Sequence, residues 1–438
     1  MKPLTGIFKI IFAFVAFAMT LAESPAQELF DAGYPPITNY LPKEYGGFPA
    51  NWAITQDERG IIFVGNSGGL MEFDGISWRM HPVTNNTDVR SLAGDGQGKI
   101  YAGSKGELGY FEPEETGKIT YFSLVEYLPA NSRNFTDLVM QTHYLDGVVY
   151  FKAGRNIFIW DTVSEEFTVV KGKSDFLVSF LANARIYVME WGTGLTVLNE
   201  NHTLGLVPGG GQFANESIYS ILPFPGKPGT LLVTTRNMGL FTFDGQKFEP
   251  FYTEADDFLK ENLIFFHGTI LSDETILLGT TLGGAVIIDR TGKILGHYDK
   301  QAGISNNFIG YTFQDRSGMV WLATNNGISI LDHLSPLRFF DGRNQILNDV
   351  YDIIRSDSYL YLTSLTEVYR LEAGSRNFQK FKNLDLSWQF ITVAGENLVI
   401  SSDGVYAIAG DDLKPIRKSV SNENFVIFKA SRCNPGRV

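Results

Sequence analysis

The chain has 438 residues and a formal net charge of −12 at pH 7, and 44% of its residues are hydrophobic. This apolar share is large enough for a folded core, which excludes an intrinsically disordered chain. The acidic balance argues against direct nucleic-acid binding, because a duplex is held by Lys and Arg side chains that displace phosphate counterions. Cys433 is the only cysteine, which excludes an internal disulfide and a cysteine-based metal site.

The first predicted element is an export signal over residues 1–26. Lys2 and Lys9 make the first nine residues positively charged, and an apolar run from Ile10 to Ala22 follows. Ser24–Ala26 then contains small residues at the expected cleavage site. This order is typical of a cleaved secretory signal peptide, and an uncleaved anchor is the alternative. The run is shorter than the ~20 residues that a membrane-spanning helix needs. We therefore expect an exported protein with no transmembrane span after cleavage.

From about residue 46 onward, one pattern recurs: an apolar strand, a turn of small residues, and a second strand. The first apolar residue after each turn serves as an anchor for the repeat. These anchors are Leu70, Leu108, Ile157, Leu195, Leu240, Ala285, Ile328, Val368 and Val405. Neighbouring anchors are 37 to 49 residues apart. A period near forty residues, with short strands rich in β-branched and aromatic residues, predicts the four-stranded blades of a β-propeller.

The nine copies predict an all-β chain in two parts. Seven four-stranded blades account for residues 34–340, about two blades of a second, incomplete propeller account for 341–415, and 416–438 form an irregular tail. One irregular ring of eight or nine blades is the alternative. Since an incomplete propeller exposes an apolar sheet face, we expect the chain to be a fragment of a longer protein. Pro35–Tyr40 is a candidate closing strand for the last blade of the first ring.

Short polar turns are predicted to fix the order of strands within a blade. Asp57–Gly60, Asp95–Gly98 and Asp315–Gly318 each begin with Asp and end with Gly. The Asp carboxylate accepts hydrogen bonds from backbone N–H groups of such a turn, and Gly adopts positive φ without strain. Asp74–Gly75 and Asp244–Gly245 are hairpin signals that lead into the outer strand. We expect the inner strands to be apolar, because neighbouring blades cover both of their faces.

No catalytic or cofactor motif occurs in the structural context that it would need. The glycine turns are followed by strands, whereas a phosphate-binding loop precedes a helix. The six histidines have no metal-site spacing, so we interpret them as ordinary turn or strand residues and expect no enzyme, metal or cofactor. A carboxylate pair meeting in the channel would leave glycosidase chemistry open. The histidines are His81, His143, His202, His267, His297 and His333.

The turns between the second and third strands of the blades are the candidate ligand-binding site. In a propeller these turns share one face with the mouth of the central channel, where polar groups suit a glycan fragment or another small polar ligand. Trp191 is the most suggestive residue, because an exposed indole stacks on a sugar ring. The candidates are Ser67, Lys105, Arg155, Trp191, Arg236, Asn237, Thr281, Asn325 and Asn326.

The chain resembles the two-component regulator propeller family of Bacteroidetes. Ile37–Tyr40, Pro42–Gly47 and Asn51–Ile54 are similar to the start of that family, and Asp315–Ile328 closely matches its repeat. The resemblance covers about residues 34–410. It departs most in two blades, where a glycine or threonine of the repeat is replaced by Lys152 and by Glu190.

Members of this family have a periplasmic sensor of two seven-bladed propellers, usually followed by a tyrosine-motif domain, a membrane span and an output domain. The output is a histidine kinase or a LuxR-type DNA-binding regulator, and none of these later parts is present in this chain. The resemblance implies an exported, non-catalytic ligand-sensing propeller, the input region of a signal-transduction or transcription regulator. The alternatives are a scaffold for protein–protein interaction and a propeller enzyme that acts on polysaccharide.

Overall fold

The structure, a computed structural model, describes residues 33–418, except for the side chains of residues 265, 266 and 418. Its described residues divide into two compact units, residues 36–334 on the one hand and residues 33–35 with 335–418 on the other. The predicted signal peptide lies outside the described residues, as does most of the predicted tail. No helix within residues 33–418 is long and apolar enough to cross a membrane.

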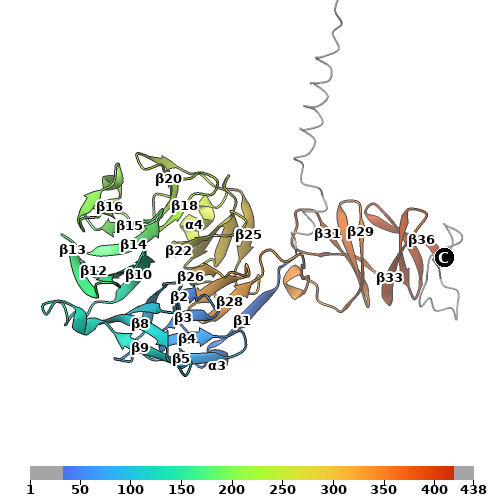
Figure 1. Cartoon of the computed structure of the whole chain (residues 1–438). Helices are drawn as coiled ribbons and strands as arrows, with labels where there is room; N and C mark the ends of the chain where they lie inside the picture. Colours follow the sequence, from blue (N-terminus) through green and yellow to red (C-terminus); the bar gives the residue numbers. More distant parts are fainter. Residues whose placement is uncertain (1–32, 419–438) are drawn as a thin grey trace, which may run out of the picture. The chain divides into compact units, whose positions relative to one another are not determined.

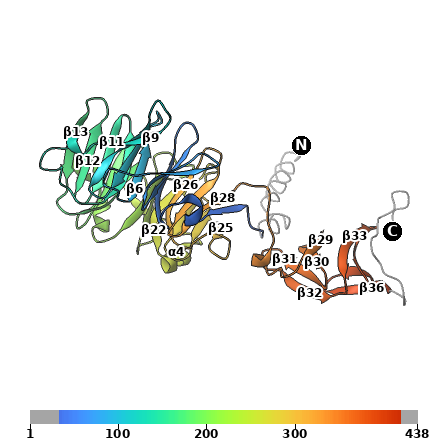
Figure 2. The same ribbon diagram turned by 90° about the horizontal axis from the view of Figure 1, so that it is seen from below.

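The larger unit, residues 36–334, contains seven four-stranded antiparallel sheets arranged as blades around a central axis (Figures 1 and 2). From the inner to the outer strand, the blades are β2–β5 (Asn51–Gln56, Ile62–Asn66, Gly69–Phe73, Trp78–His81), β6–β9 (Val89–Gly94, Ile100–Ser104, Glu107–Pro113, Ile119–Ser123), β10–β13 (Val139–Leu145, Val148–Ala153, Asn156–Asp161, Glu166–Lys171), β14–β17 (Phe176–Ala182, Arg185–Glu190, Gly194–Leu198, Leu204–Leu206), β18–β21 (Ile218–Pro223, Leu231–Thr235, Leu240–Phe243, Phe248–Pro250), β22–β25 (Ile264–Ile270, Ile276–Thr280, Ala285–Ile288, Ile294–Tyr298) and β26–β28 with β1 (Ile309–Gln314, Val320–Thr324, Gly327–Leu331, Ile37–Tyr40).

Short helices lie in the connections of this unit. The α-helices are α3 (Pro42–Tyr45) and α4 (Asp256–Asn262), and the 3-10 helices are η1 (Val125–Tyr127) and η2 (Gly210–Phe213). α4 lies between the outer strand of the fifth blade and the inner strand of the sixth, and is the longest helix of the described chain.

The strand β1 closes the ring. It pairs antiparallel with β28, so that Ile37 lies opposite Leu331 and Tyr40 lies opposite Ile328. The seventh sheet therefore combines three strands from the end of the unit with one strand that precedes the first blade. The inner strands contact one another in sequence around the ring, and β26 contacts β2. The predicted closing strand is thus confirmed.

Apolar side chains fill the spaces between neighbouring blades. Between the first and seventh blades, Val64 and Met71 belong to the same buried cluster as Trp321 and Ile328. Comparable clusters lie between other neighbouring sheets. All nine anchor residues lie in third strands and are buried. The repeat therefore marks the positions at which each blade packs on the next.

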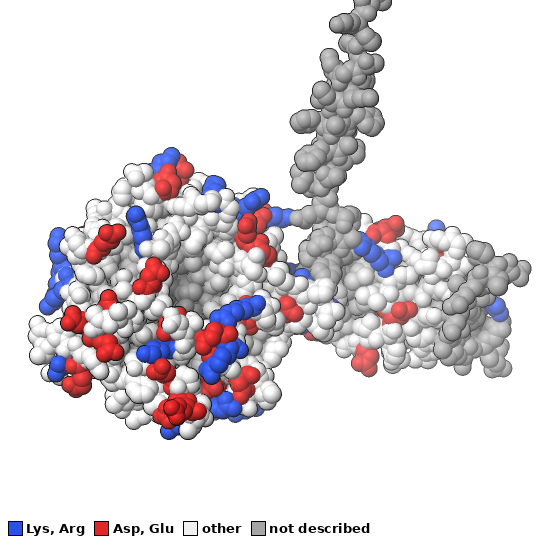
Figure 3. All heavy atoms as spheres, in the orientation of Figure 1, with Lys and Arg blue, Asp and Glu red and all other residues white. Residues whose placement is uncertain are grey.

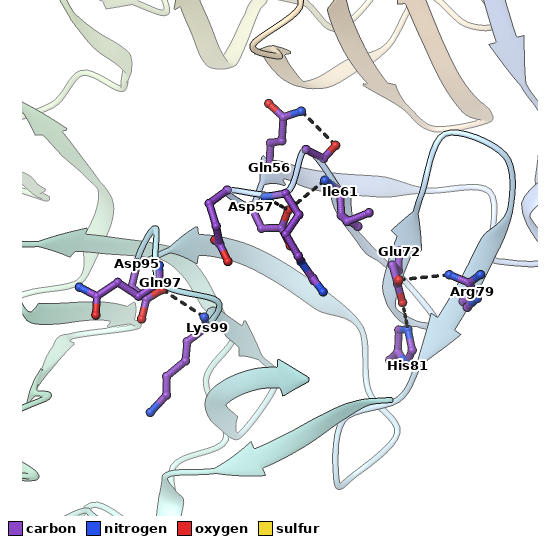
Figure 4. A network of polar contacts seen from close by, with 12 residues as sticks. Gln56, Asp57, Ile61, Glu72, Arg79, His81, Asp95, Gln97 and Lys99 are labelled. Carbon is purple, nitrogen blue, oxygen red and sulfur yellow. Dashed lines mark hydrogen bonds and ion pairs between the residues drawn. The ribbon is translucent and has the colours of Figure 1, made fainter. Parts of the chain in front are cut away.

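The Asp–Gly turns have the predicted geometry. Asp57 Oδ1 accepts a hydrogen bond from the N–H of Ile61 at 2.9 Å, and Asp95 Oδ1 accepts one from Lys99 at 3.1 Å (Figure 4). Gly60 closes the first of these turns with φ of 90°. A side chain at that position would be strained, so the Asp carboxylate and the glycine together specify the turn between the first and second strands.

The two blades that depart from the family repeat contain buried charged side chains. Lys152 Nζ donates to the carbonyl of Leu177 in the next blade at 3.0 Å, and burial lowers the pKa of Lys152 to about 8. Glu190 Oε1 accepts hydrogen bonds from the backbone N–H groups of Lys173 at 2.6 Å and Ser174 at 3.1 Å. These bonds offset the loss of hydration, so both departures are compensated locally.

The smaller unit contains two more antiparallel sheets, and the 3-10 helix η3 (Gly342–Asn344) precedes them. Together with the larger unit they confirm the predicted all-β class of seven blades plus about two. The two sheets share a buried cluster that includes Tyr361, Phe390 and Val399. Their strands are β29–β32 (Val350–Ser356, Tyr359–Ser364, Glu367–Glu372, Gln379–Asn383) and β33–β36 (Ser387–Val393, Glu396–Ser401, Gly404–Ala409, Asp412–Lys418).

We predict that Asn39→Ala destabilises the larger unit by about 1–3 kcal/mol. Asn39 Nδ2 donates to the carbonyl of Gly303 at 2.8 Å, and its Oδ1 accepts from Ser329 Oγ at 2.7 Å, so the variant removes two bonds that fasten β1. The midpoint of urea unfolding measures the effect. Thr38→Ala, on the exposed side of the same strand, is the control. Equal midpoints for the two variants would contradict this role for Asn39.

Candidate functional site

Each inner strand of the larger unit begins with an irregularity in its pairing. The register between β2 and β3 shifts after Asn51, and shifts occur near the start of the other six inner strands. A bulge leaves a residue out of the ladder and re-aims its side chain. Because Asn51 pairs with Asn66, this end of β2 lies beside the turn between the second and third strands. In six strands the residues so displaced are Trp52, Arg90, Met140, Leu177, Tyr219 and Gly310.

The seven inner strands enclose a cavity of about 470 Å³ on the axis of the ring. The space-filling view shows the larger unit hollowed at its centre (Figure 3). The polar residues that line the cavity are Arg90, Ser91, Gln141, Thr142, His143, Ser179, Ser220 and His267. The prediction that inner strands are apolar is therefore wrong along the strand edge that faces the axis, where hydroxyl and imidazole groups recur.

Hydrogen bonds between these side chains join adjacent inner strands. Ser91 Oγ on β6 lies 2.7 Å from Thr142 Oγ1 on β10 and donates to the carbonyl of Val139 at 2.9 Å. On the next pair of strands, His143 Nε2 lies 2.9 Å from Ser179 Oγ. The polar groups thus satisfy one another around the wall, as buried polar groups must.

Two histidines that the sequence analysis interpreted as ordinary strand residues face this cavity. His267 stacks on Tyr311 with ring centroids 3.7 Å apart, and its Nδ1 lies 3.2 Å from Thr312 Oγ1. Burial lowers the pKa of both His143 and His267 to about 4, and in His267 the neighbouring His143 adds to this effect. Both rings are therefore neutral at pH 7, and each presents one hydrogen-bond donor and one acceptor.

One polar atom of the wall has no partner. Gln141 Oε1 is buried and makes no hydrogen bond within the described part of the chain, although Gln141 lines the cavity. An unsatisfied buried acceptor costs about 1–3 kcal/mol. The oxygen itself has almost no exposed surface, so a molecule in the cavity would bond to it only after the side chain had rotated.

The wall carries an aromatic ring and a cation side by side. The Arg90 guanidinium lies 3.7 Å from the centroid of the Trp52 ring, and Arg90 also pairs with Asp88. Trp52 Nε1 donates to Ser67 Oγ at 3.1 Å, which fixes the orientation of the indole. The guanidinium lies over one face of the indole, so only the other face of Trp52 is available to stack on a ring that bears polar substituents.

The described wall of the cavity contains no carboxylate pair. Among the described residues, no Asp or Glu lines the cavity. Within residues 33–418 no three His, Cys, Asp or Glu side chains are grouped so as to hold a metal ion. The arrangement therefore provides hydrogen bonding and stacking, and does not provide the carboxylate pair of a glycosidase.

The nine residues predicted from the turns do not line this cavity. Two of them contact residues displaced by the bulges: Ser67 bonds to Trp52, and the Arg236 guanidinium donates a hydrogen bond to the Tyr219 hydroxyl. The remaining seven lie in their turns on the same face. These are Lys105, Arg155, Trp191, Asn237, Thr281, Asn325 and Asn326.

Several of these seven side chains are occupied by contacts with nearby turns. Arg155 Nη2 donates to the carbonyl of Gly172 at 3.2 Å, Asn237 Nδ2 donates to Glu216 Oε1 at 3.2 Å, and Thr281 Oγ1 donates to Leu263. By contrast, Trp191 is 46% exposed. Ligand binding by the turns stays a prediction.

The cavity residues that the sequence analysis missed follow a recognisable pattern. Ser91, Ser179 and Ser220 each lie two or three residues after the buried first residue of an inner strand. A polar residue recurring at that place, within a strand that otherwise packs between blades, is a signal for a position facing the axis.

No family model and no curated protein matches the chain. Several solved structures match it. The extracellular domain of a protein described as the hybrid two-component system BT3049 from B. thetaiotaomicron is 16% identical, with a TM-score of 0.64, over 91% of this chain and 57% of that one. For BT4673 from the same organism the identity is 18% and the TM-score 0.55, over 86% of this chain and 52% of that one. A streptogramin B lyase is 13% identical, with a TM-score of 0.51, over 68% of this chain and 98% of the lyase.

These likenesses show a shared propeller fold. The two extracellular domains are of the kind that the sequence resemblance indicates, and they confirm that resemblance at the level of the fold. The chain spans a little over half of their length, 52% and 57%. The lyase has the same kind of fold, so the fold by itself does not separate binding from catalysis.

We predict that acid lowers the stability of the folded protein partly through His143 and His267, which line the axial cavity. In the unfolded chain they take up protons as pH falls through about 6.5, whereas in the folded chain they stay neutral until about pH 4. Stability contributed by the neutral rings is therefore complete above pH 6.5 and is lost as pH falls towards 4. The thermal unfolding midpoint at pH 7 and pH 5 measures this loss.

The variant carrying both His143→Gln and His267→Gln should lose less stability between those two pH values than the wild type. His202→Gln, at an exposed turn, is the control and should keep the wild-type difference. A double variant with an unchanged pH dependence would show that the two rings do not titrate as described.

Proposed function

We propose that this chain is the ligand-binding part of an exported, non-catalytic sensor, and that the axial cavity of the larger unit binds a sugar unit of a glycan. The observation that carries the proposal is the chemistry of the cavity wall. It combines neutral hydroxyl and imidazole groups with an indole, and no carboxylate is among the described lining residues.

Sugars require what this wall supplies. Their hydroxyl groups both donate and accept, and the neutral His143 ring and the Ser179 hydroxyl do the same. Their C–H faces stack on aromatic rings, and Trp52 is held by Ser67 and Arg90. A cavity of about 470 Å³ lies within the usual range for a small-molecule site. Residues of the surrounding turns, such as Trp191, would contact those parts of a longer glycan that lie outside the cavity.

The sensing role is supported by the resemblance of the sequence and by the fold shared with two extracellular domains of two-component systems. A sensor needs a ligand that binds two states of a downstream element unequally. We propose a periplasmic location because the sequence predicts a cleaved signal peptide and resembles a family of periplasmic sensors. The non-catalytic part of the proposal follows that resemblance, and a glycosidase would need a carboxylate pair, which the described wall does not contain.

The test is isothermal titration of the full chain with neutral oligosaccharides of two to six units from several polysaccharides. We expect one or more to bind without being cleaved, and Trp52→Ala to weaken that binding about tenfold through loss of stacking. Tyr127→Ala removes an exposed aromatic ring outside the cavity and is the control for the loss of any surface ring.

A parallel Trp191→Ala variant distinguishes the cavity from the turn face. Loss of binding in Trp191→Ala with full affinity in Trp52→Ala would place the site on the turns, as the sequence analysis predicts, and would overturn the proposal for the cavity. Release of shorter products during the titration would overturn the non-catalytic assignment.

A further inference from the structure

A second cavity of about 260 Å³ lies beside the mouth of the channel, between the fifth and sixth blades. One wall is the turn between β19 and β20, and the other is the connection that contains α4. The lining residues that carry the chemistry are Arg236, Asn237, Met238, Tyr252, Asp257 and Lys260.

The backbone on both sides of this cavity is held in place. Thr235 Oγ1 donates to the carbonyl of Gly239 at 2.7 Å and accepts from the N–H of Met238 at 3.0 Å, which fixes the turn. At the first residue of α4, Asp256 Oδ1 accepts from the N–H of Thr253 at 3.1 Å and from its hydroxyl at 2.7 Å. A ligand would therefore meet a pre-formed surface, which reduces the entropic cost of binding.

Arg236 begins the turn between β19 and β20 and lines this second cavity. Its guanidinium donates a hydrogen bond to the hydroxyl of Tyr219, and Tyr219 directly precedes Ser220, which lines the channel cavity. Among the described residues, no carboxylate lies within ion-pair distance of Arg236 or of Lys260. Arg236 and Lys260 thus line one cavity without forming an ion pair to any described residue, although the carboxylates of Asp256 and Asp257 in α4 line the same cavity.

Apolar side chains beside these cations are unusually exposed. Tyr252 is 79% exposed and Met238 is 44% exposed, and both line the cavity. An exposed tyrosine ring next to an unpaired guanidinium is suited to a sugar ring that carries a carboxylate: the ring stacks, and the planar guanidinium binds both carboxylate oxygens.

We propose that this cavity is a subsite for an acidic sugar, a uronate unit, in the same glycan whose neighbouring unit occupies the channel. The inference rests on the proposed function. The glycan would extend from the mouth of the channel over the turn face to Arg236, so the ligand is an acidic oligosaccharide of at least two units. Lys260 adds positive charge on the opposite wall.

The experiment compares two probes by titration of the full chain. One is a panel of uronate oligosaccharides of two to four units, made of galacturonate, glucuronate, mannuronate or guluronate. The other is the same panel after reduction of its carboxyl groups to neutral alcohols. We expect at least one acidic oligosaccharide to bind at least tenfold more tightly than its reduced form, because charge-assisted bonds are stronger than neutral ones.

Arg236→Ala should remove that preference and leave the affinity for the reduced form unchanged. Arg236→Lys should restore only part of it, since an ammonium group lacks the paired donors. Arg185→Ala is the control. It makes the same change of charge at the start of β15, the second strand of the fourth blade, at the end of that strand away from the turn face, and it should have no effect.

The failures of the two proposals are distinguishable. Equal affinity for acidic and reduced probes, or an Arg236→Ala variant that keeps the acidic preference, overturns the uronate subsite while channel binding stands. The subsite is also overturned if only neutral oligosaccharides bind. If no oligosaccharide of either kind binds, the proposed function itself falls, and the subsite falls with it.

Discussion

The structure of the larger unit depends on one constraint: each small sheet has two apolar faces, and only another sheet covers them. Burial of such faces is the main favourable term in folding. A linear stack would leave its two end sheets uncovered, whereas a ring has no end. Closure requires β1, and the pairing of Ile37 with Leu331 joins segments that lie almost three hundred residues apart in the chain. The buried cluster around Met71 and Trp321 then seals the last space between blades.

The inner strands meet a second demand, because they also form the wall of the axial cavity. Their side chains pack against neighbouring blades, yet their edge towards the axis carries hydroxyl, imidazole and amide groups. Pairs such as Ser91 with Thr142 and His143 with Ser179 satisfy these groups across blade boundaries. The bulges free the second residue of most of these strands from the ladder, which places Trp52 and Arg90 at the wall. Binding groups are therefore obtained from the same strands that hold the ring together.

Because the blades repeat, similar turns surround the mouth of the channel. A turn or connection that departs from the repeat is therefore a place where one ligand can be distinguished from another. The connection before β22 is such a departure, since it contains α4, the longest helix of the described chain, and lines the second cavity. Lys152 and Glu190 depart from the repeat as well, but their charges are bound by neighbouring backbone groups. In contrast, Arg236 keeps its charge free of any described acidic partner, with one hydrogen bond to Tyr219. This difference separates a departure that serves packing from one that is available to a ligand.

The sequence by itself determined the blade repeat, the anchors, the Asp–Gly turns and the closing strand, because each depends on residues adjacent in the chain or on a regular period. It also indicated the face of the ring that carries Ser67 and Arg236. Only the tertiary structure decided which polar residues meet in the channel. His143 and Ser179 are 36 residues apart, and Ser91 and Thr142 are 51 apart, so no local pattern joins them. The pairing of Arg236 with Tyr219 likewise depends on how a turn folds over a bulge, since side-chain encounters between strands follow from register and blade rotation, which a single sequence does not state.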